Sequence, residues 1–207
     1  MYKVIHKMNN LFGKGKEKIL EFFYRNRNNE IYFSEILRGT KLTPNTTLKH
    51  LRNLEKEKLI FSKKKIGNTF YKINLSNPII YSIFSYFDYK RFNELPLERK
   101  RAITEFLNKI KIKPLITLIF GSTAKKTFNK KSDIDILLVY NNKESQDKKL
   151  KEDIESITGV RIQTFIIDFD YFKDQILRKE DKVVSHAIKT GFIMEGFNNF
   201  YREVLNG

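Results

Sequence analysis

Two aspartates separated by one residue, Asp133 and Asp135, are the side chains of this sequence best placed to act together chemically. They stand at the start of an apolar run, Ile136–Tyr140, that is typical of a buried strand. Successive side chains of a strand point to opposite faces, so the two carboxylates share one face while Ile134 and Ile136 share the other. Carboxylates held this close repel each other unless a cation lies between them, and hard divalent cations prefer such oxygen ligands. The pair therefore predicts a divalent-cation site.

A second element precedes this pair and must help to position it. The apolar run Leu115–Phe120 predicts a strand, and Gly121 and Ser122 end it, with ten residues between Ser122 and Asp133. Glycine allows the backbone to approach a phosphate closely, and Ser122 adds a hydroxyl and an N–H group at the turn. The polar loop that follows contains Lys125, a further cation. Together these residues predict a phosphate-bearing ligand beside the cation.

The order strand, Gly-Ser, ten residues, Asp-x-Asp resembles the signature of the DNA polymerase β-like nucleotidyltransferase superfamily. It is most similar to the minimal nucleotidyltransferases of archaea and bacteria, some of which are antitoxins paired with HEPN-domain toxins. The resemblance covers about residues 100–207 and implies a mixed sheet flanked by helices. It also implies two-metal transfer of a nucleotide from ATP or another nucleoside triphosphate to a hydroxyl group.

The resemblance assigns roles to particular residues. Asp133 and Asp135 would be the catalytic carboxylates that hold Mg²⁺ (or Mn²⁺), and Gly121 and Ser122 would contact the β- and γ-phosphates. The Ala-Arg-Gly that usually follows Gly-Ser reads here Ala124-Lys125-Lys126, so the loop glycine is lost and a lysine is gained. We expect Lys125 to contact the nucleotide.

The third carboxylate of the family is missing from its expected place. The strand predicted over Val160–Ile167 has Gln163 where an acid is expected. Asp168 lies five residues further on, with the opposite strand parity, and is expected past the strand end. Nucleotide and metal binding survive this departure better than catalysis does, with Gln163 still beside the nucleotide. A C-terminal helix is predicted over residues 186–205, with a short apolar edge between Gly191 and Gly196.

Positive charge is concentrated in the first part of the chain. The net charge is +16, and residues 1–77 carry 17 Lys and Arg against 6 Asp and Glu, a net of +11. Residues 114–207 carry 15 against 14 and are almost neutral. A phosphate backbone attracts such a polycation, although a solvated lysine-rich surface is the alternative. The absence of cysteine excludes disulfides and thiolate metal sites and favours a reducing cytoplasm, and no apolar run is long enough to predict a membrane span.

The basic segment has the pattern of a winged helix-turn-helix. Thr43 is expected to cap a helix that begins at Pro44, with Leu48, Leu51 and Leu54 on its inner face. Two β-like runs, Leu59–Lys64 and Thr69–Leu75, follow. The pattern resembles the winged-helix DNA-binding domains of bacterial and archaeal regulators, which place the exposed face of the third helix in a major groove and basic wing residues beside phosphates.

Candidate nucleic-acid contacts, with DNA favoured over RNA, come from the exposed face of that helix and from the wing: Asn45, Thr46, Thr47, Lys49, His50, Arg52, Asn53, Lys63, Lys64 and Lys65. Such modules also serve as protein–protein or dimer contacts, so this alternative stays open.

The expected fold class is therefore α/β (α+β), in three parts. Residues 1–77 form the winged helix, 78–110 two linking helices, and 111–207 the nucleotidyltransferase-like domain. The first linking helix is rich in aromatic residues, which favours an interdomain or homodimer core over a base-stacking surface. The expected partners are DNA or RNA, a nucleoside triphosphate, a HEPN-type toxin and a second copy of the chain, without a membrane.

Overall fold

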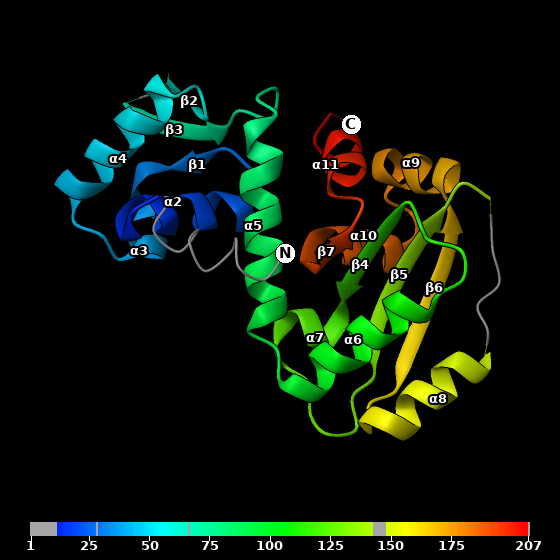
Figure 1. Cartoon of the computed structure of the whole chain (residues 1–207). Coiled ribbons are helices and arrows are strands. Elements are labelled where there is room, and N and C mark those ends of the chain that lie inside the picture. The colour runs from blue at the N-terminus through cyan, green and yellow to red at the C-terminus, as the bar shows by residue number, and fades with distance from the viewer. Residues whose placement is uncertain (1–11, 28, 66, 143–147, 207) are drawn as a thin grey trace. The chain divides into compact units, whose positions relative to one another are not determined.

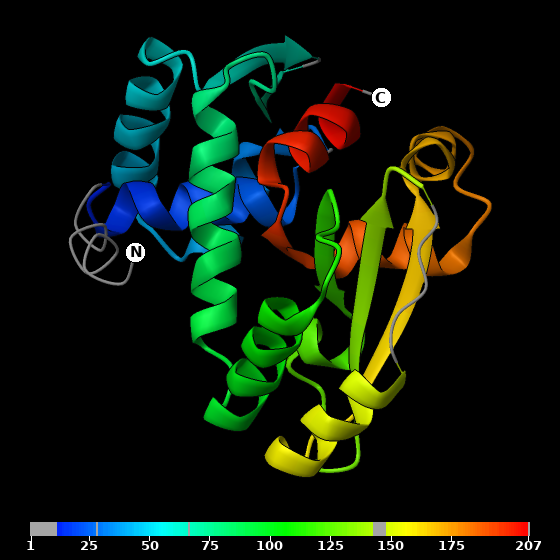
Figure 2. The same cartoon turned by 45° about the vertical axis from the view of Figure 1, so that its right-hand side comes forward.

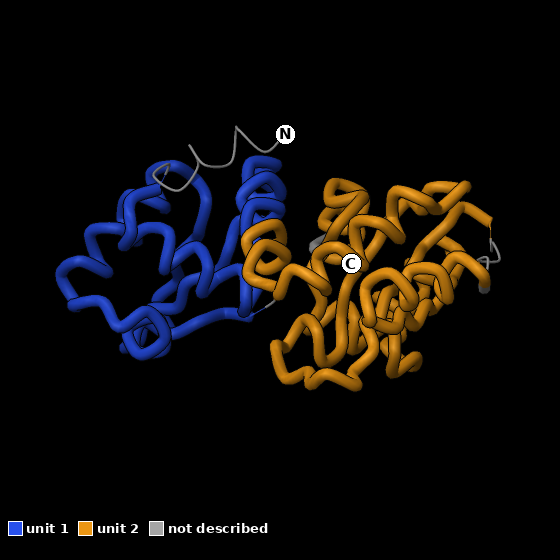
Figure 3. Tube along the Cα trace, turned by 60° about the horizontal axis from the view of Figure 1, so that its bottom comes forward, with its two compact units in different colours: residues 1–87 blue, residues 88–207 orange. Residues whose placement is uncertain are grey.

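The computed structural model describes residues 12–27, 29–65, 67–142 and 148–206. It divides into two compact units, Met1–Phe87 and Asp88–Gly207 (Figure 3). The boundary between the two units falls inside helix α5 (Ile79–Asn93). Within the described residues, no helix combines the length and the apolar character that crossing a membrane requires.

The first unit combines helices with a small sheet (Figure 1). Its elements before α5 are α2 (Lys14–Arg25), β1 (Ile31–Tyr32), α3 (Phe33–Thr40), α4 (Pro44–Lys56), β2 (Ile60–Lys65) and β3 (Asn68–Ile73). The strands form a three-stranded antiparallel sheet in the order β1-β3-β2.

Helix α4 begins where the sequence predicted. The side chain of Thr43 accepts a hydrogen bond from the backbone N–H of Thr46, and Pro44 occupies the first turn, where its missing N–H needs no partner. The inner face is formed by Leu51, Leu54 and Thr47. Leu48, expected on that face, is only partly buried, so the helix is rotated relative to the expected apolar stripe.

Aromatic side chains of α5 belong to the cores of the two units. In the first unit, the ring centroids of Phe84 and Phe87 each lie 5.4 Å from that of Tyr24 on α2. In the second unit, Phe92 is buried in the main apolar cluster and Tyr89 packs against it. These rings thus pack against other residues of the same chain. They give no support to a homodimer, which stays a prediction.

The second unit is built on a four-stranded mixed sheet with the order β6-β5-β4-β7. Strands β4 (Ile116–Phe120) and β5 (Ile134–Tyr140) are antiparallel, and so are β4 and β7 (Phe192–Glu195). Strand β6 (Ile162–Asp168) runs parallel to β5. The helices are α6 (Leu97–Lys109), α7 (Gly121–Lys125), α8 (Lys148–Thr158), α9 (Phe169–Arg178), α10 (Lys182–Thr190) and α11 (Phe197–Asn206).

Alternation along β5 separates the core from the candidate site. Ile134, Ile136 and Leu138 are buried in a cluster with residues of α6 and α8, on one face of the sheet. Asp135 points to the opposite face, on the side where α10 lies (Figure 2). The mixed sheet with helices on both faces agrees with the expected nucleotidyltransferase fold.

The expected C-terminal helix over residues 186–205 is wrong. This segment contains the end of α10, strand β7 and helix α11, and β7 is an edge strand of the sheet. Glycine is required at both ends of β7: a Cβ at Gly191 would lie 2.5 Å from the carbonyl oxygen of Ala187, and one at Gly196 only 1.9 Å from that of Leu115. The apolar edge between the two glycines is the strand itself.

Candidate functional site

Gly121 brings the end of β4 against the carboxylate of Asp135. Phe120, the last residue of β4, is the register partner of Asp135 on β5. The chain turns at Gly121 with a φ of 65°, a left-handed conformation that glycine adopts without strain. A Cβ at this position would lie 2.0 Å from Oδ2 of Asp135. Any other residue here would displace the carboxylate, so Gly121 is needed for the site itself.

Asp133 and Asp135 form a pair of interacting carboxylates. The pKa of Asp135 is raised, first by burial and then by the negative charge of Asp133, while the charges of His186 and Arg99 oppose the shift. The side chain of Asp133 is 29% exposed, and its Oδ1 lies 3.7 Å from Nε of Arg161. A destabilised pair of carboxylates is a donor set that suits a hard divalent cation.

Within the part of the chain that the structure describes, no third His, Cys, Asp or Glu completes this set. Among the described residues, there is no group of three or more His, Cys, Asp or Glu side chains that could hold a metal ion. The two aspartates can hold one face of a cation, whose other positions would be filled by water or by phosphate oxygens, as is usual for Mg²⁺. The residues present therefore fit a cation that arrives together with a phosphate-bearing ligand.

Gln163, the residue expected in place of a third carboxylate, lies on β6 beside Asp135 of β5. In the parallel pair of β5 and β6 it is the register partner of Asp135, so both side chains are on the same face of the sheet. Asp168 instead pairs with Tyr140 and is the last residue of β6, about 16 Å further along the strand. Its side chain accepts a hydrogen bond of 2.7 Å from the backbone N–H of Tyr171 and caps α9. Asp168 therefore does not substitute for Gln163.

A buried arginine, which the sequence reasoning missed, holds the loop that carries Asp133. Arg99 on α6 is 3% exposed. Its guanidinium donates to Oγ1 of Thr123 at 2.8 Å and to the carbonyl oxygens of Asn129 and Ser132 at 3.2 and 2.6 Å. Its carbon Cζ lies 4.1 Å from the ring centroid of Phe128. Arg99 thus joins α7 to the loop that enters β5.

The signal for Arg99 was present in the sequence pattern. Ala102, Ile103 and Phe106 follow it at positions three, four and seven, the spacing of a buried helix face. An arginine at the first position of that face must find acceptors inside the protein, because a buried charge without hydrogen bonds is strongly destabilising. The acceptors are backbone carbonyls of a loop, and nothing in their sequence shows that they are near.

His186 and Lys125 lie on the border of the site. The ring of His186, on α10, packs edge-on against Phe120, with centroids 6.1 Å apart. Its pKa is lowered by burial first and then by the charge of Lys125, whereas Asp135 opposes the shift. Lys125, at the end of α7, is exposed. Its charge is thus close enough to reach His186, on the side of the sheet that carries Asp135.

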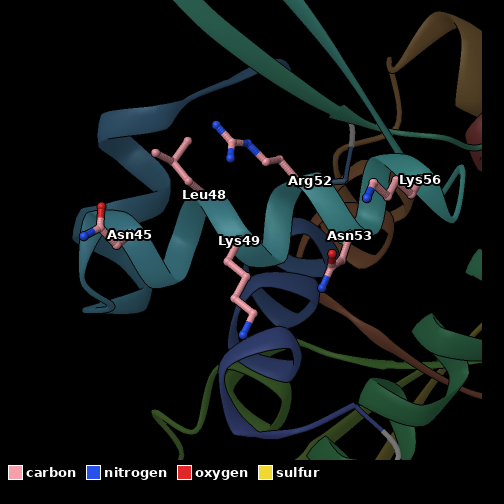
Figure 4. A pocket seen from close by; sticks show the side chains of 6 residues that line it. All are labelled: Asn45, Leu48, Lys49, Arg52, Asn53 and Lys56. Atoms are coloured by element: carbon pink, nitrogen blue, oxygen red, sulfur yellow. The ribbon is translucent and has the colours of Figure 1, made fainter.

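The candidate nucleic-acid residues on α4 lie in three different environments. Asn45, Lys49, Arg52 and Asn53 are exposed, and together with Leu48 and Lys56 they line an open hollow of about 390 Å³ (Figure 4). Leu48 and Arg52 extend from one side of the helix in this view, and Lys49 and Asn53 from the other. This face contains no acidic side chain, which suits a polyanion.

Thr47 does not belong among the expected nucleic-acid contacts. It is fully buried, and its hydroxyl donates to the carbonyl oxygen of Thr43 at 3.0 Å, so it cannot contact a base. Thr46 is engaged with the cap, since its hydroxyl accepts from that of Thr43 at 2.8 Å. His50 is partly buried against α2, where a Cβ at Gly15 would lie 2.4 Å from its Nε2.

The three lysines of β2 also differ in their exposure and in their contacts. Lys63 and Lys64 are exposed and, as neighbours in a strand, point to opposite faces. Lys65 is paired with Glu30, and its Nζ lies 5.0 Å from the ring centroid of Phe70. Lys63 and Lys64 are therefore the more available phosphate contacts.

Comparison with known proteins supports the second unit's assignment. Residues 101–189 match the family model described as "Polymerase beta, Nucleotidyltransferase", a segment that contains Gly121, Asp133, Asp135 and Gln163. This match supports a nucleotidyltransferase-type function for the domain. No curated protein matches the sequence at a significant level.

A solved structure, described as "Crystal structure of the toxin-antitoxin with AMP-PNP", is similar to part of the chain. It shares 17% sequence identity with a TM-score of 0.39, and the alignment covers 54% of this chain and 83% of the other. A likeness this low carries no argument about function.

Proposed function

We propose that the second unit binds a nucleoside triphosphate together with a divalent cation and transfers a nucleotide from it to a hydroxyl group of a protein or an RNA. The observation that carries this proposal is the placement of Asp135 against the backbone of Gly121, inside the segment that matches the nucleotidyltransferase family model. Asp133 and Asp135 are the proposed cation ligands. Mg²⁺ or Mn²⁺, when bound there, would neutralise phosphate charge and lower the pKa of the attacking hydroxyl.

The chain's own residues have distinct proposed tasks in this reaction. Gly121 and Ser122, at the start of α7, offer backbone and hydroxyl groups to the phosphates, and Lys125 adds a positive charge at the other end of this short helix. Arg99 keeps the loop before Asp133 in place through its bonds to Asn129 and Ser132. The hydroxyl oxygen bonds to the α-phosphorus, pyrophosphate leaves, and the hydroxyl proton passes to solvent.

For the first unit we propose a winged helix that binds DNA, with RNA as the alternative ligand. The element order, the three-stranded sheet and the acid-free exposed face of α4 support this role. Asn45 and Asn53 are the proposed base contacts, and Lys49, Arg52, Lys63 and Lys64 the proposed phosphate contacts. A HEPN-type toxin is a proposed partner on the family resemblance alone.

A second candidate function is favoured by Gln163. A neutral amide in register with Asp135 brings no negative charge to a second cation. A DNA-binding regulator whose transferase domain binds a nucleotide without transferring it would tolerate this residue. The two functions share the nucleotide site and differ in the chemical step.

The experiment that separates them measures transfer from α-labelled ATP with Mg²⁺ to protein or RNA acceptors in a cell lysate. We expect slow transfer by the wild type and faster transfer by Gln163→Asp, because a carboxylate here restores the charge that the second cation needs. Gln163→Ala is the matched control, since it removes the amide without adding charge. Absence of transfer by both the wild type and Gln163→Asp, with ATP binding intact, would favour the regulator.

A further inference from the structure

The three-stranded sheet of the first unit has an outer face whose aromatic side chains the proposed function does not use. Ile31, Ile60, Tyr71 and Ile73 are buried on its inner face, against the helices. Because side chains alternate along a strand, their neighbours share the outer face. These are Tyr32 on β1, Phe61, Lys63 and Lys65 on β2, and Asn68, Phe70 and Lys72 on β3. Of these seven side chains, three are aromatic, three are basic and one is an amide.

The aromatic rings of this face are accessible and firmly placed. Tyr32 is 42% exposed and Phe61 is 57% exposed, although large apolar side chains are normally covered. The rings of Tyr32 and Phe70 are in contact, with centroids 4.0 Å apart and their planes tilted by 46°. The backbone N–H of Tyr32 donates to Oε2 of Glu35 at 2.8 Å, which fixes the end of β1 at the start of α3. Strand spacing puts Tyr32 and Phe61 about 12 Å apart.

The lysines surround these rings with positive charge. Lys63 and Lys72 are exposed on the same face as Phe61. Two carboxylates lie nearby: Glu30 is paired with Lys65, and Glu35 accepts the backbone hydrogen bond of Tyr32. The pKa of Glu30 is lowered, first by its hydrogen bond to Lys65 and also by the charges of Lys63 and Lys72, so all three lysines act at this place. The face keeps an excess of positive charge after that pairing.

We propose that this outer face, with Tyr32 and Phe61 as stacking rings and Lys63 and Lys72 as phosphate contacts, binds single-stranded nucleic acid. Flat rings on a sheet can stack only on bases that are unpaired, and flanking cations then follow the backbone. A duplex offers no open base faces, and its proposed base contacts are on α4. The inner layer of buried residues separates α4 from this outer face, and Lys63 is the one residue proposed to contact both ligands. Charge complementarity selects a polyanion, and the accessible rings select bases over an acidic protein.

The test is binding of the full chain to a labelled oligothymidylate of about 12 nucleotides, followed by fluorescence anisotropy. Phe61→Leu and Tyr32→Leu keep an apolar side chain but remove the ring, and each should weaken binding about tenfold. Phe61→Tyr should bind like the wild type. Lys63→Ala with Lys72→Ala should weaken binding and reduce its dependence on salt.

Two controls test whether a loss of oligothymidylate binding comes from the outer face of the sheet. Leu177→Ala changes an apolar side chain of the second unit that is 68% exposed, and it should not alter binding. Lys49→Ala with Arg52→Ala should leave oligothymidylate binding unchanged even where it weakens duplex binding, which separates this proposal from the one for α4. Circular dichroism and thermal melting verify that each variant is folded.

Two results would overturn the proposal. The first is wild-type affinity for oligothymidylate in both leucine variants, because the rings would then contribute no stacking. The second is displacement of the oligonucleotide by polyglutamate at equal charge concentration, which would indicate an acidic protein as the partner of this face.

Discussion

The two units of this molecule place their charged groups in opposite ways. Residues 1–87 carry a net charge of +11, and several of their cations, among them Lys49, Arg52 and Lys63, lie on the surface. In the second unit, two charged groups at the candidate site are shielded from solvent: Arg99 is 3% exposed, and burial raises the pKa of Asp135. Surface charge acts at long range on a polyanion, whereas buried charge requires defined partners and so builds a defined site. The first unit is suited to binding a polymer and the second to positioning a small ligand.

The largest effect should come from the buried cation. Arg99→Met removes the hydrogen bonds that Arg99 donates to Thr123, Asn129 and Ser132, and we expect the free energy of unfolding to fall by about 3 kcal/mol. Thermal unfolding should then occur about 6–12 °C lower. Arg101→Met changes an exposed arginine of the same helix and is the matched control. Equal melting temperatures for the two variants would show that the contacts of Arg99 contribute nothing.

This contrast also determines how much could be predicted from the sequence. The strands that carry Gly121 and Asp135, the cap of α4 at Thr43 and the location of the positive charge follow from local patterns, because alternation, capping and composition are local. The position of Gln163 also follows, since family spacing and strand parity place it opposite Asp135.

The predictions that were wrong or incomplete concern hydrogen bonds and packing that residue types and spacing do not show. The pairing of β7 with β4 turned an expected helix into a strand, and short segments between glycines do not show their partners. Thr47 was expected on the exposed face because it is polar, but its hydroxyl is satisfied within the helix and it packs inward. The role of Arg99 could not be predicted, because the carbonyl oxygens that accept its hydrogen bonds belong to a loop some 30 residues away in sequence.

A moderate effect is expected from the exposed cations of α4. Replacing Lys49 and Arg52 by alanine should weaken duplex DNA binding about tenfold and reduce the slope of log affinity against log salt by about 2, because two phosphate contacts are lost. Melting should be unaffected. The pair Lys111→Ala and Lys182→Ala removes the same charge from exposed positions of the second unit. An equal loss in both pairs would indicate that total charge, and not the face of α4, determines binding.

The smallest expected effect is on the stability of the cation-free protein, and it comes from the negative charge of Asp135. The pKa of this group is raised in the folded chain, so its ionisation favours unfolding. This loss of stability is absent below the unfolded-state pKa of an aspartate, near 4, and it develops as the pH rises through the pKa of Asp135 in the folded chain. Asp135→Asn should therefore raise the melting temperature of the cation-free protein by about 2 °C at neutral pH.

The pH dependence verifies this interpretation. The gain of Asp135→Asn should shrink as the pH falls toward about 4, where Asp135 is protonated in both states. Asp153→Asn, which changes an exposed aspartate of α8, should give no such gain. A gain that is the same at all pH values would mean that packing, and not charge, is responsible.

The central claim is that Asp133 and Asp135 hold a divalent cation together with a nucleoside triphosphate. The most direct test is the melting temperature of the wild type and of the double variant Asp133→Asn, Asp135→Asn, each with and without Mg²⁺ and ATP. A ligand at about 100 times its Kd stabilises the folded state by about 2.7 kcal/mol, so the wild type should melt about 5–10 °C higher with both ligands. The folded double variant should show no rise. A wild type that responds to no triphosphate with Mg²⁺, or a double variant that responds as the wild type does, would contradict the claim.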